Sequence, residues 1–340
     1  MNRKDISEPT VRILSVSSKS CWYCRRPLTS DSKGEICGTC NRTLRFSDLT
    51  TGDSVQGRQA EALVDIELCI NSTISRLTNN QIRPFGFISQ NGSVVALYLQ
   101  KQNLSALPFS TVQLQGLKVV DCRYNELETI PGMLTKLRSL EVGLFGNNQI
   151  SSESIPRTLS NLDRLKTLDL SYNRLTEIPE VVGELSNLLS LNLSGNNISS
   201  WGELAYGGSF PSLEVLTLND VRLTSLPPWL AHLPSLRVLR LANNQLRSLP
   251  DEFCEHYSLE YLDLSNNLFT TIPEVVEEMV GLKDIVLADN PIRGAEDKIR
   301  QIKKQHQDLW WELSSQDSFI RKEKDRRRTS SNRQGWLSKK

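Results

Sequence analysis

Apolar residues recur along most of the chain in one short pattern. Between residues 94 and 293 the pattern returns every 23 or 25 residues, and one copy reads Leu165-x-x-Leu168-x-Leu170. Alternate side chains of a strand face the same way, so these leucines predict a short strand that buries one of its faces. Nine copies stand in register, which predicts nine parallel strands, one from each repeat.

A second column of residues follows each predicted strand. It lies three residues after the Leu-x-Leu pair and is asparagine in most copies, so its amides can bond to neighbouring backbone groups in a ladder from repeat to repeat. Six copies then continue to a Leu-Pro or Ile-Pro pair, where proline fixes φ as the chain turns back. The column positions are Gln102, Asn125, Asn148, Asn173, Asn196, Val221, Asn244, Asn267 and Asn290.

The complete pattern, L-x-x-L-x-L-x-x-N-x-L, resembles the leucine-rich-repeat family, in its intracellular 23-residue class with a Leu-Pro turn. It covers residues 94–293, which is 200 of 340 residues. The resemblance implies an α/β solenoid with a curved parallel sheet that binds protein partners on its concave face. One repeat cannot bury its leucines alone, but stacked neighbours bury a continuous core.

Four positions depart from the repeat. Gln102 and Val221 replace the column asparagine, which predicts a weaker ladder at the first and sixth repeats. Gly143 stands where a core leucine is expected and Leu144 follows it, so the third repeat either has a slipped register or exposes a leucine. Cys122 occupies a core position and is interpreted as a small buried hydrophobic residue.

An open stack needs a cap at each end. Residues 58–93 are predicted to form the N-terminal cap, with a hairpin at Asn91-Gly92 and a helix that carries apolar residues at Ala62, Leu63, Ile66, Cys69 and Ile70. Residues 294–314 are predicted to form a C-terminal capping helix, with apolar residues at Ile299, Ile302, Leu309, Trp310 and Leu313.

Four of the seven cysteines form two Cys-x-x-Cys pairs near the start of the chain. Cys21, Cys24, Cys37 and Cys40 have the spacing of a tetrahedral structural zinc site, and residues 19–46 resemble the zinc-ribbon and zinc-knuckle group. Four thiolates would leave no position for a catalytic water. An unpaired or redox-active set is the alternative. Residues 47–57 suit a linker to the repeats.

The formal net charge of +1 conceals three differently charged regions. Residues 1–50 carry +4, residues 51–320 carry −10 and residues 321–340 carry +7. Residues 315–340 have too little apolar content to fold and are predicted to be a disordered basic tail. The start MNRKDISEPT lacks the apolar core of a signal peptide, and no apolar run is long enough to cross a membrane, so a cytoplasmic protein is expected.

Motifs of the common catalytic sites are missing from the sequence. There is no GxSxG, phosphate loop or His-Glu-x-x-His, and the Leu-Asp-Leu aspartates are interpreted as ordinary repeat positions, so no enzyme is predicted. Bulky or charged side chains at variable strand positions are instead candidates for binding a protein. These candidates are Tyr98, Leu144, Arg240 and Tyr261.

The sequence therefore predicts a scaffold or adaptor for protein–protein interaction, with a structural Zn²⁺ and a partner on the concave face. The alternative is a nucleic-acid-associated protein that uses the basic zinc module and the basic tail. These ends could also contact an anionic surface. A regulatory component of an enzyme is a third class, which nothing in the sequence selects.

Overall fold

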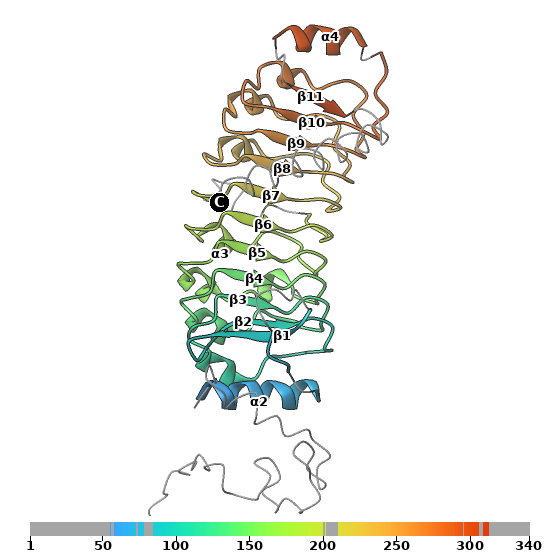
Figure 1. Cartoon of the computed structure of the whole chain (residues 1–340). Helices are drawn as coiled ribbons and strands as arrows, with labels where there is room; N and C mark the ends of the chain where they lie inside the picture. Colours follow the sequence, from blue (N-terminus) through green and yellow to red (C-terminus); the bar gives the residue numbers. More distant parts are fainter. Residues whose placement is uncertain are drawn as a thin grey trace, which may run out of the picture.

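Short strands stack along most of the chain in a computed structural model (Figure 1). The structure describes residue 55 and residues 58–72, 74–77, 84–199, 201, 210–294, 296–305 and 309–312. In this part, eleven strands form one sheet in chain order. They are β1 (Phe85–Gln90), β2 (Ser93–Leu99), β3 (Val119–Asp121), β4 (Val142–Leu144), β5 (Thr167–Asp169), β6 (Ser190–Asn192), β7 (Val215–Thr217), β8 (Val238–Arg240), β9 (Tyr261–Asp263), β10 (Asp284–Val286) and β11 (Trp310–Glu312).

Every neighbouring pair from β2 to β11 is parallel, which confirms the predicted solenoid. In β4 to β9 the middle residue is buried and the two outer residues are half-buried. The three leucines of each repeat therefore point into one continuous core, because only the stack removes them from water.

The third repeat keeps its register despite Gly143. Val120 pairs with Gly143 and Asp121 pairs with Leu144, so Leu144 lies on the outer face. Phe145 occupies the next core position, is fully buried and fills the volume that Gly143 leaves, since a Cβ at Gly143 would lie 3.0 Å from its ring. The alternative of a slipped register is therefore wrong.

Prolines begin most of the short helices on the side opposite the sheet. Pro108, Pro131, Pro179, Pro227 and Pro250 each stand at the N-cap, which confirms the predicted turn. The elements are α3 (Glu180–Gly183) and the 3₁₀ helices η1 (Phe109–Gln113), η2 (Gly132–Lys136), η3 (Ser152–Ser154), η4 (Arg157–Asn161), η6 (Pro228–His232), η7 (Asp251–Glu255) and η8 (Glu274–Glu277).

A helix and a hairpin close the first repeat. Helix α2 (Arg58–Ile70) buries Ala62, Leu63 and Ile66, and the Gln59 amide oxygen accepts a hydrogen bond from the Val94 N–H at 3.0 Å. Strands β1 and β2 are antiparallel and join at Asn91-Gly92, where both residues have positive φ. Both predicted elements are present, but Cys69 is exposed and does not belong to the buried face.

The C-terminal end differs from the single helix predicted over 294–314. Helix α4 (Glu296–Gln305) is shorter, buries Ile302, and is held to η8 by an ion pair from Lys298 to Glu277. Trp310 lies in β11, which adds a last parallel strand to β10. Within the described residues, no helix has the length and apolar character that crossing a membrane requires.

Candidate functional site

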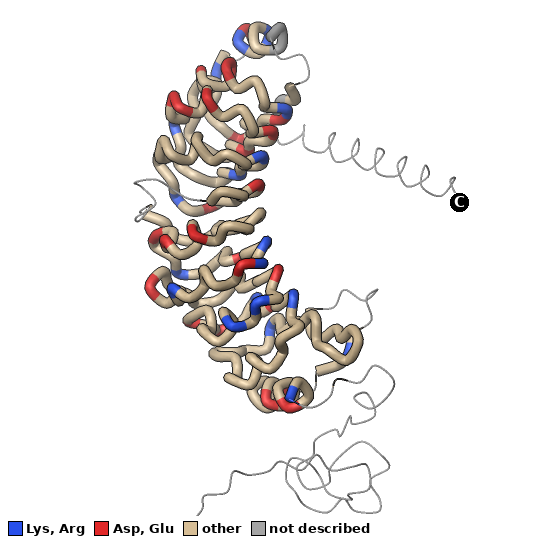
Figure 2. Tube along the Cα trace, turned by 90° about the vertical axis from the view of Figure 1, so that its left-hand side faces the viewer, with Lys and Arg blue, Asp and Glu red and all other residues tan. Residues whose placement is uncertain are grey.

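The outward-facing strand residues line the inner side of a curved stack. Figure 1 shows the strands side by side, and Figure 2, turned by 90°, shows the curvature of the same chain. Because each three-residue strand turns its middle side chain inward, its first and third side chains form two rows on the concave face. This is the face on which the sequence predicts a partner.

The four predicted contact residues all lie half-buried on this face, but they form two separate pairs. The first pair is Tyr98 and Leu144, which lie on either side of Asp121, the strand partner of both. Arg240 places its guanidinium carbon 5.4 Å from the centre of the Tyr261 ring, within the range of a cation–π contact. Strands β5 to β7 separate the pairs, a span of roughly 19 Å at the usual strand spacing.

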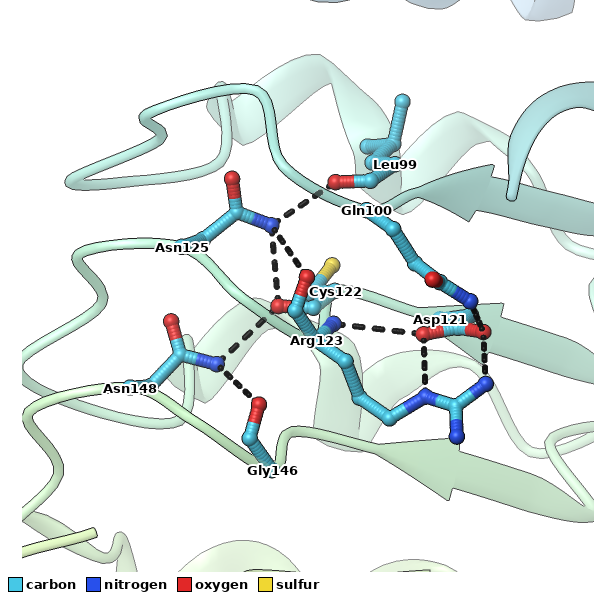
Figure 3. A network of polar contacts seen from close by, with 8 residues as sticks. All are labelled: Leu99, Gln100, Asp121, Cys122, Arg123, Asn125, Gly146 and Asn148. Carbon is cyan, nitrogen blue, oxygen red and sulfur yellow. Dashed lines mark hydrogen bonds and ion pairs between the residues drawn. The ribbon is translucent and has the colours of Figure 1, made fainter. Parts of the chain in front are cut away.

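The buried carboxylate of Asp121, next to the first pair, accepts hydrogen bonds from two neighbouring side chains (Figure 3). Asp121 is only 1% exposed and accepts hydrogen bonds from Arg123 Nε at 3.0 Å and Arg123 Nη2 at 2.8 Å. Gln100 Nε2 donates to the same carboxylate at 2.6 Å. This two-point pair raises the pKa of the Arg123 guanidinium and holds its side chain against Asp121, so the two opposite charges offset each other.

The other aspartates of the Leu-Asp-Leu column fix turns. Asp169 accepts hydrogen bonds from the Ser171 N–H at 3.0 Å and hydroxyl at 2.6 Å. Asp263 accepts the same two bonds from Ser265. Each carboxylate is thus engaged with its own strand end, in agreement with their interpretation as repeat positions rather than paired acids.

The asparagine column forms the predicted ladder. Asn148 Nδ2 donates to the Cys122 carbonyl at 3.0 Å (Figure 3). It also donates to the Phe145 carbonyl at 2.9 Å, and the Asn148 oxygen accepts from the Leu127 N–H at 3.0 Å. The side-chain amide of Gln102 donates to the nearby Gln100 carbonyl rather than across to another repeat, and Val221 has no side-chain amide. The ladder therefore holds the turn after each strand in one conformation, with gaps at the two predicted repeats.

A polar groove follows the edge of the concave face from the end of β5 to the end of β9, so it begins beyond Leu144 and runs alongside the strands of Arg240 and Tyr261. Its volume is about 670 Å³. Its lining residues are Tyr172, Asn192, Ser194, Thr217, Asn219, Asp220, Asn243, Asn244 and Asn266. The sequence interpretation missed this groove, because it ranked strand positions by bulk and charge and did not examine the column immediately before the ladder asparagines.

That column, which we name the rim column, has positive φ in every repeat. Its members are Lys101, Tyr124, Asn147, Tyr172, Gly195, Asp220, Asn243, Asn266 and Asp289. Asparagine, aspartate and glycine are the residues expected in this left-handed conformation. Tyrosine is not, so a tyrosine recurring among asparagines is the sequence signal by which this site could be found.

Two buried titratable groups lie away from the concave face. Burial raises the pKa of the Cys122 thiol well above its usual range, which makes it inert and agrees with its interpretation as a core residue. Burial also lowers the pKa of His256 to about 4, so this imidazole is neutral at pH 7. Neither group lies where a ligand would reach it.

The predicted zinc ligands Cys21, Cys24, Cys37 and Cys40 lie outside the described residues. Among the residues that the structure describes, no three histidine, cysteine or acidic side chains gather closely enough to hold a metal ion.

Comparison with known families agrees with the repeat pattern. A family model described as leucine rich repeat matches residues 153–198, 211–269 and 234–292. No curated protein matches the chain by sequence. The matched segments include β6 to β10, the part of the stack that carries most of the groove.

Solved structures share the fold. A leucine-rich-repeat protein of Leptospira interrogans is 30% identical over 62% of this chain, with a TM-score of 0.50, and the chain spans 58% of its length. An internalin from Listeria monocytogenes is 20% identical over 75% of this chain and 68% of its own, with a TM-score of 0.56. A chain in the Toll–Spatzle complex of Drosophila is 23% identical over 62% of this chain and 28% of its own, with a TM-score of 0.53.

Proposed function

We propose that this leucine-rich-repeat solenoid is a non-enzymatic scaffold that binds a partner protein on its concave face. The observation that carries the proposal is the pair of outward rows on the parallel sheet, in which Arg240 and Tyr261 form a half-buried cation–π pair. Arginine and tyrosine are enriched among the residues that dominate binding energies at protein interfaces.

The rigidity of the face supports the same proposal. The asparagine ladder and the strand register fix each backbone position before any partner arrives, so association costs little ordering of the chain. In the Toll–Spatzle complex, a protein with this fold is part of an assembly with another protein. A stack of this fold is therefore suited to binding a protein.

The test is affinity purification from cells with the wild-type chain and with Tyr98→Ala, Arg240→Ala and Tyr261→Ala combined. We expect the triple variant to lose partners that the wild type retains. Tyr257→Ala is the matched control, because Tyr257 is 71% exposed and lies in the turn before β9 rather than on the concave face. Unchanged partners at equal folding would exclude this face.

The two ends of the chain add further proposals. The spacing of Cys21, Cys24, Cys37 and Cys40 supports a structural zinc module ahead of the repeats. The free thiols of Cys69, Cys122 and Cys254 support a reducing, cytoplasmic location, which a fluorescent fusion at either end would test. In this arrangement the solenoid holds a partner and the basic ends supply additional contacts.

A nucleic-acid-associated protein is the second candidate, and the charge distribution favours it. The head carries +4 and the tail +7, while the segment between them is acidic. Binding through such ends releases counterions, so affinity for a DNA or RNA probe should fall steeply between low and physiological salt. An affinity that does not change with salt would contradict this function and leave the scaffold proposal intact.

A further inference from the structure

Two tyrosines of the rim column occupy a backbone conformation that does not suit them. Tyr124 has φ of 59° and Tyr172 has φ of 52°, in the left-handed region where a bulky residue is an outlier. Their side chains are 48% and 53% exposed, so burial does not explain their presence.

The repeat itself imposes this conformation, whatever the side chain. The Tyr172 N–H donates to the Ser194 carbonyl at 2.7 Å, and the Tyr124 N–H donates to the Gly146 carbonyl at 3.0 Å. Asn147, Asn243 and Gly195 occupy the same turn in other repeats. The solenoid can therefore be built with asparagine at these positions and does not need tyrosine for its fold.

Tyr172 stands at one end of the polar groove. Its ring lies against Gly195, where a Cβ atom would overlap it, so glycine in the next repeat leaves the room that the ring occupies. From there the groove continues over Asn192, Ser194 and Asn219 of the following strands. The aromatic ring and the amides thus form one continuous surface.

Two amides of this groove, those of Asn192 and Asn219, are oriented as hydrogen-bond donors. The Asn192 side-chain oxygen accepts from the Ser194 N–H at 3.1 Å, and the Asn219 oxygen accepts from the Ala242 N–H at 2.9 Å. Each oxygen is engaged, which leaves the NH₂ groups to donate to a ligand. The ligand must therefore offer acceptors to these two groups. Asp220 is the one charged residue among those that line the groove, and its negative charge disfavours an acidic ligand.

We propose that Tyr172 and this groove bind an uncharged, extended segment of a partner protein. Main-chain carbonyls of the segment would accept from Asn192 and Asn219, while one of its apolar side chains packs on the Tyr172 ring. Tyrosine with asparagine, serine and glycine is the composition by which protein-binding surfaces combine a rigid anchor with adaptable hydrogen bonds. This inference rests on the proposed function and names the contact region and the class of partner segment.

The experiment selects a random peptide library, displayed on phage, against the full wild-type chain. Enriched peptides are then titrated against wild type, Tyr172→Asn and the exposed control Tyr257→Asn. We expect Tyr172→Asn to weaken binding at least about tenfold and Tyr257→Asn to leave it unchanged. Because asparagine suits the left-handed turn, we expect the melting temperature of Tyr172→Asn to equal or exceed that of the wild type.

Several results would overturn the inference. These are failure to enrich any peptide, equal binding by Tyr172→Asn, or a lower melting temperature that makes Tyr172 a structural residue. Binding to an immobilised glycan array in place of peptides would assign the groove to carbohydrate and also overturn it. Peptides that depend on Arg240 and Tyr261 but not on Tyr172 would contradict this inference while sustaining the proposed function.

Discussion

At the scale of single residues, His256 interrupts a column of core side chains that precedes each strand. The same position in other repeats is occupied by Leu114, Leu137, Leu162, Leu185, Leu233 and Met279, all buried. His256 is itself only 2% exposed, and its Nδ1 lies 3.4 Å from the Ser258 hydroxyl. A titratable ring has thus replaced an aliphatic side chain without leaving the core.

This replacement predicts a stability that depends on pH. Burial lowers the pKa of His256 from 6.5 to about 4, so protonation is harder in the folded chain than in the unfolded chain. The neutral ring's contribution is therefore fully present above pH 6.5 and is lost as pH falls toward 4. The loss amounts to about 3 kcal/mol at most. Urea unfolding of wild type and His256→Leu across this range measures it.

Met279 provides the control for that measurement. It occupies the same column in the last repeat, is buried and does not titrate, so Met279→Leu should leave the pH dependence of unfolding unchanged. His256→Leu should flatten the part between pH 6.5 and 4, because leucine fits the column and does not titrate. An equal pH dependence in wild type and His256→Leu would show that the imidazole is not the responsible group.

At the scale of elements, each ladder asparagine joins two repeats. Asn244 Nδ2 donates to the carbonyls of Leu218 and Leu241 at 2.8 and 2.9 Å, and its oxygen accepts from the N–H groups of Val221 and Leu223. Asn244→Ala would leave these buried backbone groups without partners. We expect a loss of roughly 3 kcal/mol in the free energy of unfolding, measured by urea denaturation.

Gln102 is the matched control within the same column. It makes one side-chain bond, to the Gln100 carbonyl at 2.7 Å, and lies at the first repeat where no parallel strand precedes it. Gln102→Ala should cost less than about 1 kcal/mol. Equal losses in the two variants would mean that the ladder contributes no more than an ordinary surface amide.

The sequence predicted those elements that depend on local periodicity. Repeats, hairpin, Leu-Pro turns and ladder all follow from residues close together in the chain. Strand β11 could not be predicted this way, because Ile299, Ile302 and Trp310 also fit a helical pattern, and pairing between Trp310 and Asp284 is a long-range contact. The sequence pattern also did not predict that the Phe145 ring fills the space left by Gly143, because periodicity does not measure how side chains fill space.

The candidate site shows the same division between local pattern and geometry. Outward positions such as Arg240 and Tyr261 follow from strand alternation, so the concave face could be predicted. The rim column was missed, because a tyrosine such as Tyr172 among its asparagines carries meaning only once the positive φ of that column is known. Only the ladder's three-dimensional geometry reveals that this tyrosine is held in place by its neighbours.

At the scale of the whole molecule, charge separates the ends of the chain from its middle. Figure 2 shows acidic and basic residues interspersed along the described stack, where Lys118, Glu141 and Lys166 form one of its ion-pair ladders. The excess of basic charge lies in residues 1–50 and 321–340. Whether the basic residues 1–50, the head, can bind a partner separately from the stack therefore depends on whether they fold as a module of their own.

Zinc in the head is the prediction that decides this point. Native mass spectrometry of the full chain should show one zinc ion, which Cys21→Ser with Cys37→Ser should abolish, because tetrahedral thiolate sites need all four ligands. Cys69→Ser with Cys254→Ser is the control and should retain the metal, since both residues belong to the solenoid. Metal loss should unfold a head too small for an apolar core but leave the solenoid's unfolding transition unchanged. An identical mass for wild type and the head variant would contradict the zinc module.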